Sequence, residues 1–206
     1  MTITWLGHSC FRLESAGFRL LIDPYYGVAG YPELHTTAHA VYCSHEHYDH
    51  NYREGVTLLP APENPFTVET LAVWHDPEQG ALRGANTIHI FSAEGLRVAH
   101  LGDLGHPLSP EQRAQLGRCD AILCPVGGFY TLEPDLLKAE LDALSPRCIV
   151  PMHYRHDPYG LPAVAPREVF LEQYPASQLR FLDSNRFSLT ADTPSAVIVP
   201  LYQGLS

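Results

Sequence analysis

The chain has 206 residues, 45% of them hydrophobic, and a net charge of −10 with histidine counted as neutral. This length is sufficient for one large domain with a buried core, and the apolar fraction is typical of a soluble globular protein. The negative charge argues against nucleic acids and anionic membranes as partners, and no apolar run approaches the roughly 18 residues of a membrane span. The unusual feature is the twelve histidines.

The expected elements fall into two classes along the chain. In the first half, segments that alternate apolar and polar residues predict β-strands, the first three of them in an antiparallel meander. These strands are expected at 2–7, 10–14, 18–23, 39–44, 56–60, 66–74, 86–91 and 96–101. The sequence Ser-Ala-Glu-Gly, residues 92–95, predicts a hairpin turn between the last two.

Helical signals begin later. Ser109 as N-cap, Pro110 and Gly117 delimit one helix, and the segments 133–144 and 165–174 predict two more. In 133–144 we expect one apolar side, formed by Leu136, Leu137, Leu141 and Leu144. Nearly all-apolar strands at 120–126 and 147–152, and further strands at 178–183 and 195–202, alternate with these helices. Two sheets with helices outside them, an α/β fold in a single domain over 1–206, would bury all of these faces.

A dense cluster of metal-ligand types follows the strand at 39–44. The segment His45-Glu46-His47-Tyr48-Asp49-His50 places His45 and His47 on the same side of an extended backbone, and a turn carries Asp49 and His50 to a neighbouring position. One short segment can thus supply two metal positions. A His-rich loop without function is the alternative, but borderline cations prefer this set of nitrogen and oxygen ligands.

Further candidate ligands follow other apolar strands. His75, Asp103 and His153 each come directly after such a strand and before an abrupt loop. Any one of them alone could be a capping or core-lining polar residue. Together with the cluster they predict a metal centre at the ends of several strands.

The pattern His-x-His-x-Asp-His, followed by a lone His, an Asp and a final His, resembles the metallo-β-lactamase superfamily. The strings GHSCFRLE, LIDPYY, HLGDLGH and PVGGFYT resemble its small single-domain metal-dependent hydrolases, which are related to ascorbate 6-phosphate lactonases. The resemblance implies a four-layer αββα sandwich. It also implies two divalent ions, zinc by default and manganese or iron as alternatives.

The resemblance assigns a role to each candidate. It implies that His45, His47 and His75 hold a first ion. Asp49, His50 and His153 would hold a second, and Asp103 would bridge the two. Asp23 would orient the cluster loop through hydrogen bonds. No cysteine is needed, unlike in single-zinc lactamases with a cysteine ligand.

Such a centre implies a hydrolase. Two divalent ions sharing one water lower its pKa to near 7, and the resulting hydroxide attacks a carbonyl or phosphorus. We expect Asp49 to take up and return the proton. With two carboxylates the centre stays positive, so the expected substrate is small and anionic, a phosphodiester or a lactone or ester.

Substrate contacts are less well determined by the sequence. His106, Arg155 and His156 follow ligand-bearing strands and are candidates to bind an anion, although solvated loops are equally compatible. The backbone N–H groups of Gly127 and Gly128 could bind an oxyanion or simply form a turn. His8 and His100 are interpreted as buried, hydrogen-bonded core histidines, and Arg83 and Asn86 as pocket lining at most.

Alternative functions remain open. A metal-binding module without turnover would keep the same ligands, and a nuclease-type phosphodiesterase would need a basic face, which the charge disfavours. The start of the chain lacks a signal-peptide pattern, and its five cysteines are scattered without a C-x-x-C pair. We therefore expect a cytoplasmic protein. A homo-oligomer is compatible with the size but not indicated by any residue.

Overall fold

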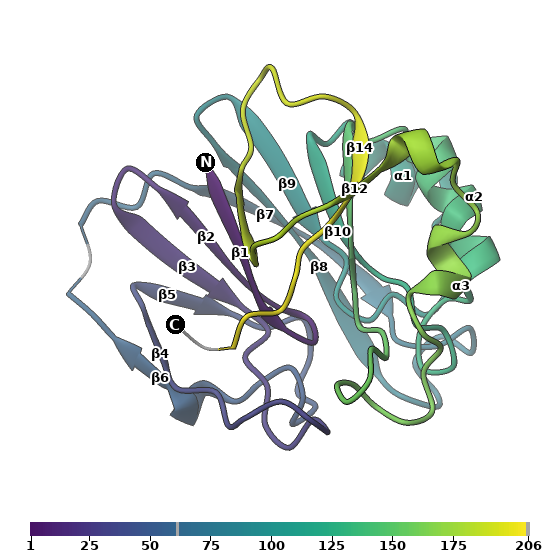
Figure 1. The fold of residues 1–206 in the computed structure, drawn as a ribbon, viewed down its shortest axis with the longest axis horizontal. Coiled ribbons are helices and arrows are strands. Elements are labelled where there is room, and N and C mark those ends of the chain that lie inside the picture. Colours follow the sequence, from purple (N-terminus) through teal and green to yellow (C-terminus); the bar gives the residue numbers. More distant parts are fainter. Residues whose placement is uncertain (61, 205–206) are drawn as a thin grey trace.

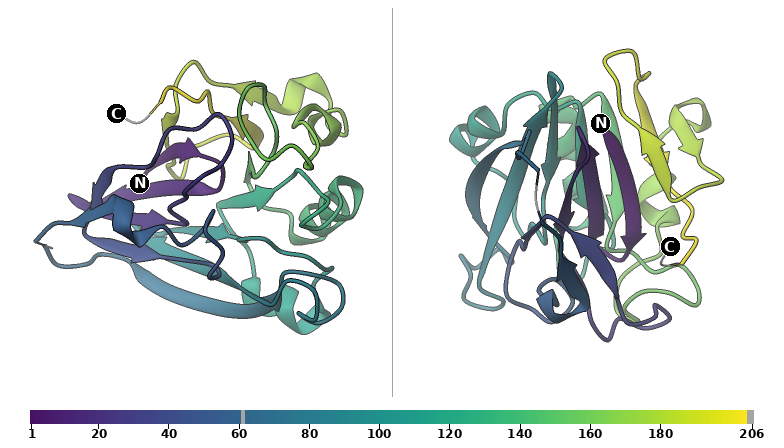
Figure 2. Two further views of the ribbon diagram at one scale, coloured as in Figure 1. Left: turned by 90° about the horizontal axis from the view of Figure 1, so that it is seen from below. Right: turned by 90° about the vertical axis from the view of Figure 1, so that its left-hand side faces the viewer.

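The computed structural model describes residues 1–60 and 62–204. Two sheets pack face to face, and the helices cover the outer face of the larger one (Figure 1; Figure 2). This arrangement confirms the expected mixed α/β fold with two sheets. None of the helices in the described part of the chain is long and apolar enough to cross a membrane.

The smaller sheet contains the N-terminal meander. Strands β1 (Thr2–Gly7), β2 (Cys10–Ser15) and β3 (Phe18–Ile22) pair antiparallel as expected. Strand β5 (Ala40–Tyr42) adds in parallel to β3, and β13 (Arg186–Ser188) pairs with the free edge of β1. The short β13 was not expected, because three residues are too few for alternation to give a strand signal.

The larger sheet has seven strands in the order β12-β14-β11-β10-β9-β8-β7. Its antiparallel part is β7 (Thr67–Trp74), β8 (Ala85–Ala93) and β9 (Leu96–His100). The parallel part is β10 (Ala121–Pro125), β11 (Cys148–Met152), β12 (Leu179–Phe181) and β14 (Ala196–Val199). The turn between β8 and β9 is the expected hairpin, since Glu94 and Gly95 both have positive φ, at 56° and 71°.

The helices agree with their sequence signals to different degrees. Helix α1 (Pro110–Leu116) has a complete capping box between Ser109 and Gln112. Helix α2 (Pro134–Leu144) buries Leu137 and Leu141, but Leu136 is exposed, a correction to the expected apolar side. Its side chain is about 100° from Leu137 around the helix and therefore turns to solvent. Helix α3 (Glu168–Leu171) is much shorter than the expected 165–174.

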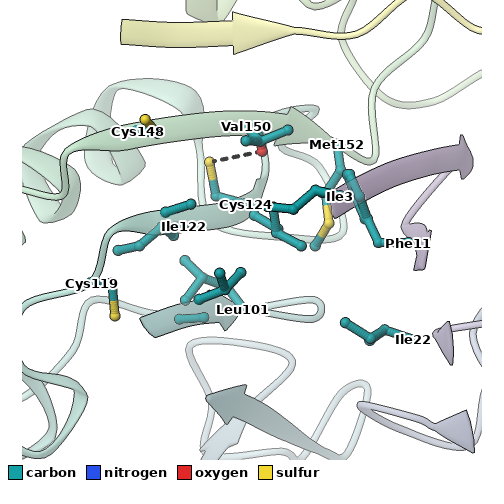
Figure 3. Close-up of a cluster of buried hydrophobic side chains, with 14 of the residues drawn as sticks. Ile3, Phe11, Ile22, Leu101, Cys119, Ile122, Cys124, Cys148, Val150 and Met152 are labelled. Atoms are coloured by element: carbon teal, nitrogen blue, oxygen red, sulfur yellow. Dashed lines mark hydrogen bonds between the residues drawn. The ribbon is translucent and has the colours of Figure 1, made fainter. Parts of the chain in front are cut away.

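The main hydrophobic cluster contains residues of both sheets and of the helices. It combines Ile3, Phe11 and Ile22 from the smaller sheet with Val150, Met152 and other residues from the larger one, as Figure 3 shows. A second cluster, including Leu6, Leu21 and Tyr25, lies on the other face of the smaller sheet. That face is covered by the segment after β3 and by the two-stranded sheet of β4 (Thr36–Ala38) and β6 (Val56–Leu58), rather than by a helix.

Candidate metal centre

Six polar residues follow the carboxyl ends of six strands. His8 comes directly after β1, Asp23 after β3, His75 after β7 and His153 after β11, while His45 and Asp103 lie three residues beyond β5 and β9. Within each sheet these strands run in the same direction, so their ends lie at the same edge. The sheet pairing therefore brings together residues that are up to 145 positions apart in the chain.

Asp103 is the centre of the cluster. Its Oδ2 atom lies 3.1 Å from Nε2 of His75, 3.3 Å from Nε2 of both His50 and His153, and 3.9 Å from Nε2 of His45. The carboxylate and these four rings are buried. The Nε2 atoms of His45, His50 and His153 have no hydrogen-bond partner among the described residues. Buried nitrogens that converge on one carboxylate without hydrogen bonds are the donor set of a metal site.

Two ligand groups flank Asp103. The outer group consists of His45, His47 and His75, of which His47 is exposed. The inner group consists of His8, Asp49, His50 and His153, all of them buried. Within each group the ligand atoms lie within 4.8 Å of one another. The structure thus brings together every residue expected to bind metal, and it adds His8.

Asp23 supports the cluster from behind. It is fully buried, and its two carboxylate oxygens accept hydrogen bonds from the backbone N–H of Ser44 at 2.7 Å and from the Ser44 hydroxyl at 2.6 Å. Its Oδ2 also lies 2.8 Å from Nδ1 of His50. A proton on Nδ1 donated to this carboxylate leaves Nε2 of His50 free to bind a cation. These contacts agree with the orienting role expected for Asp23.

The buried carboxylates remain ionised. Burial alone would raise the pKa of Asp103, but the rings of His153 and His50 hold that pKa well below its usual range. Similarly, burial would raise the pKa of Asp23, while His100 and His50 lower it. The same is true of Asp49, whose pKa is held low by the adjacent His8 and His50 despite its burial. The centre therefore concentrates negative charge that a cation would neutralise.

The pKa values of the histidines depend on burial and on the charged groups around each ring. Burial and the nearby His50 lower the pKa of His45 to about 3, and burial with His153 lowers the pKa of His8 to about 4, so both rings are neutral at pH 7. Burial would also lower the pKa of His50, but Asp103 and Asp23 raise it well above the usual value. A site that attracts a proton so strongly to Nε2 of His50 attracts a metal ion for the same electrostatic reason.

The loop that carries Asp103 is fixed by Asn86. The Asn86 side chain accepts a hydrogen bond from the backbone N–H of Asp103 at 3.1 Å and donates one to the carbonyl of Leu101 at 2.9 Å. Gly102, which has a φ of 55°, packs closely against the side chain of Asn86, and a Cβ at this position would lie 2.2 Å from Oδ1 of Asn86. The sequence indicated pocket lining at most for Asn86; the structure shows that it holds the central carboxylate in position.

A cavity of about 550 Å³ opens onto the centre. The lining residues are Glu46, His47, Tyr48, Asp49, His75, Arg83, Asp103, Tyr130, His153 and Leu161. Arg83 is the only arginine or lysine among these described residues, and its guanidinium carbon lies 5.7 Å from the centre of the Tyr130 ring. A cavity of this size suits a small molecule.

Asp76 determines where Arg83 lies. The Asp76 carboxylate, which is buried, accepts hydrogen bonds from four backbone N–H groups of the loop after β7. The donors are Glu78 at 2.9 Å, Gly80 at 3.0 Å, Leu82 at 3.1 Å and Arg83 at 2.7 Å. The sequence reasoning did not single out Asp76. An Asp at the start of a Pro- and Gly-containing loop is the signal that could have indicated it.

The structure does not bring the residues expected to bind substrate to this cavity. The ring of His106 accepts a hydrogen bond from the backbone N–H of Trp74 at 3.1 Å, and its Nδ1 lies 2.8 Å from the carbonyl of Pro107. Gly127 packs so closely against the backbone of His153 that a Cβ would lie 2.3 Å from its carbonyl oxygen, and a Cβ on Gly128 would crowd Glu133. Arg155 and His156 belong to short bridges beyond β11. Substrate binding by these five residues stays a prediction.

The two histidines interpreted as core residues differ. His100 is buried and hydrogen-bonded as expected, with Nε2 2.9 Å from the carbonyl of Ser9 and Nδ1 accepting from Gly102 at 3.1 Å. His8 is buried but was wrongly expected to be hydrogen-bonded, since neither ring nitrogen has a hydrogen-bond partner in the described structure. Its position directly after a strand, like those of His75 and His153, is the signal that could have identified it.

Comparisons with known proteins agree with this geometry. The family model described as beta-lactamase superfamily domain matches residues 2–153. A UPF0173 metal-dependent hydrolase of Carboxydothermus hydrogenoformans is 28% identical, with 75% of this chain and 84% of the relative aligned. A UPF0173 protein of Pyrococcus abyssi is 31% identical, with 75% and 83% aligned.

A solved structure is similar over almost its whole length. It belongs to a Thermotoga maritima protein assigned to the Zn-dependent hydrolases of the metallo-beta-lactamase superfamily. The two chains are 29% identical, the TM-score is 0.73, and the similarity covers 96% of each chain.

Proposed function

This chain belongs to the beta-lactamase superfamily, and on that premise we propose that it is a metal-dependent hydrolase whose centre holds two divalent metal ions, zinc by default. The observation that carries this proposal is the set of four imidazole nitrogens within 3.1–3.9 Å of one buried carboxylate oxygen of Asp103. The outer and inner groups on either side of that carboxylate supply ligands for one ion each. Manganese or iron would fit the same nitrogen and oxygen donors.

The reaction we propose is attack of water on a carbonyl carbon or a phosphorus atom. When bound, the two ions would supply a shared water whose pKa is lowered toward 7 and would polarise the bond under attack. Asp103 holds the two halves of the centre together, and Asp23 and Asn86 fix its geometry. Asp49, which lines the cavity, is placed to accept a proton from the attacking water and return it to the leaving group.

The substrate we propose is a small anion, either a phosphodiester or a lactone or ester that carries a charged group. Arg83 supports this choice, because its guanidinium lies in the lining of the cavity and a bidentate donor suits phosphate or carboxylate oxygens. The hydrogen bonds that backbone N–H groups of this loop donate to the Asp76 carboxylate reduce the conformational freedom of Arg83 before the substrate arrives.

Elemental analysis and a substrate panel test the proposal. We expect two metal ions per chain and hydrolysis of at least one class among bis-p-nitrophenyl phosphate, a lactone and an uncharged p-nitrophenyl ester. Bound metal without any turnover would favour the alternative of a binding module. Cleavage of nucleic acid in preference to small diesters would favour the nuclease-type phosphodiesterase.

Replacing Arg83 tests the charge of the substrate. Arg83→Ala should lower kcat/KM for the anionic diester by about ten-fold, through the loss of roughly 1.4 kcal/mol of interaction, and should leave hydrolysis of the uncharged ester nearly unchanged. Arg118→Ala, at an exposed arginine outside the cavity lining, is the matched control. Equal losses on charged and uncharged substrates would contradict an anion-binding role.

A further inference from the structure

His8 occupies an unusual position for a histidine without a hydrogen bond. It lies in the tight turn between β1 and β2 with φ at 49°, and its side chain is almost completely buried. Neither ring nitrogen has a hydrogen-bond partner in residues 1–60 and 62–204. A buried polar group without a partner costs free energy, so such a residue needs another explanation.

The surroundings of the ring supply that explanation. Nε2 of His8 lies 3.3 Å from Oδ2 of Asp49, and the ring centre lies 4.4 Å from that of His153. The ligand atoms of these residues and of His50 lie within 4.8 Å of one another. Donors bound at about 2.0–2.2 Å to one cation lie roughly 3–4 Å apart, and Oδ2 of Asp49 lies 3.3 Å from Nε2 of His8 and 3.8 Å from Nε2 of His50.

The backbone holds His8 against the inner group. Its carbonyl accepts a hydrogen bond from the indole Nε1 of Trp5 at 3.0 Å and one from the backbone N–H of His153 at 3.4 Å. The turn of the smaller sheet is thereby joined to the end of β11 in the larger sheet. His153 also has a positive φ, 52°, so two residues in left-handed conformations face each other at this point.

We propose that His8 is a ligand of the inner metal position, together with Asp49, His50 and His153. This inference rests on the proposed metal centre and goes beyond the ligand set that the sequence resemblance implied. With Asp103 shared between both groups, the inner position has five protein donors and the outer position four. The outer position, which has fewer donors and includes the exposed His47, is then the one with more room for water and substrate.

Cobalt binding to wild-type protein and to two His8 variants tests the inference. His8→Asn fits the positive φ but removes the imidazole donor, so one of the two ions should bind at least ten-fold more weakly. His8→Cys replaces it with a thiolate, and the cobalt protein should show a thiolate-to-cobalt charge-transfer band in the near-ultraviolet that wild type lacks. His89→Gln changes a buried histidine outside all metal groups and is the control.

The outcomes separate the two proposals. His8→Asn protein that binds both ions with wild-type affinity, or folded cobalt-loaded His8→Cys protein without the charge-transfer band, would overturn ligation by His8. Wild-type protein that takes up fewer than two ions at saturation would overturn the binuclear centre instead. A band in His8→Cys protein with a single ion would preserve the inference about His8 while refuting the second ion.

Discussion

The outer and inner groups differ in how their ligands are assembled. Two of the three outer residues, His45 and His47, come from one short segment, and His47 is exposed. The inner group draws on three separate segments, and every member is buried. Asp23 also holds the ring of His50, and the turn after β1 holds the backbone of His153. In the proposed centre, burial and the number of donors would both favour a tightly held inner ion and a more accessible outer one.

This difference assigns separate roles to two positions that look equivalent in the sequence. Ligands that are buried and fixed by neighbours lose little freedom on binding and hold a cation firmly. An exposed ligand leaves space for solvent and substrate, as a catalytic metal position requires. We expect the inner ion to stabilise the fold and the outer ion to contact the substrate, and variants of individual ligands test this difference.

The largest effect is expected from Asp103→Asn. Because Oδ2 of Asp103 faces nitrogens of both groups, losing its charge should weaken the binding of both ions by more than about 100-fold and abolish hydrolysis. Elemental analysis after dialysis measures the loss of metal. Asp142→Asn, at an exposed carboxylate on α2, is the control. Retention of both ions would refute the bridging role.

His47→Ala and His50→Ala should separate the two positions. His47→Ala removes an exposed outer ligand, so we expect one ion to be lost, activity to disappear and the melting temperature to change little. His50→Ala removes a buried inner ligand and should lower the melting temperature as well, because its partner Asp23 is left uncompensated. Equal changes in melting temperature would mean that the two positions are not distinct.

Asp23→Asn should act through the loop rather than through a ligand. An amide cannot accept as strongly from Ser44 and His50, so the free energy of unfolding should fall by about 2–3 kcal/mol and metal affinity by about 10–100-fold. Denaturant titration and chelator competition measure the two effects. Unchanged stability with lost metal would instead indicate that Asp23 binds metal directly.

A smaller effect is expected from pH on the metal-free protein. The pKa of His45 is about 3 and that of His8 about 4 in the fold, against about 6.5 when unfolded. Between pH 6.5 and 4 the unfolded chain therefore binds more protons, so the free energy of unfolding should decrease as pH falls through this range. His50, whose pKa is raised, opposes this trend near pH 6.5, where the unfolded ring is only partly protonated, and adds no slope at lower pH, where the ring is protonated in both states.

Replacing one of these rings checks the origin of the slope. His45→Gln should flatten the dependence between pH 6.5 and 4, whereas the exposed His35→Gln should leave it as in wild type. Denaturant titrations at several pH values measure how the free energy of unfolding depends on pH. The same slope in all three proteins would place its source outside the centre.

The sequence predicted most strands, because alternation and apolar runs are local patterns. It also indicated seven candidate ligands, which the structure brings together, since a ligand-rich segment and polar residues directly after apolar strands can be recognised without coordinates. The sequence did not predict elements whose presence or length depends on contacts with distant parts of the chain. The short β13 exists because β1 offers a free edge, and α3 is shorter than its propensities suggested. The extent of the domain, the cellular location and the oligomeric state stay predictions.

The residue types that can bind metal, and their positions after strands, can be recognised in the amino-acid sequence. The packing of the two sheets places Asp103 between two groups and His8 beside the inner one, and the Asp76 loop brings Arg83 to the cavity. The two kinds of information differ because the interactions behind them differ in range. Side-chain alternation and ligand spacing act over a few residues, whereas the convergence of strand ends requires two sheets to pack around a common core.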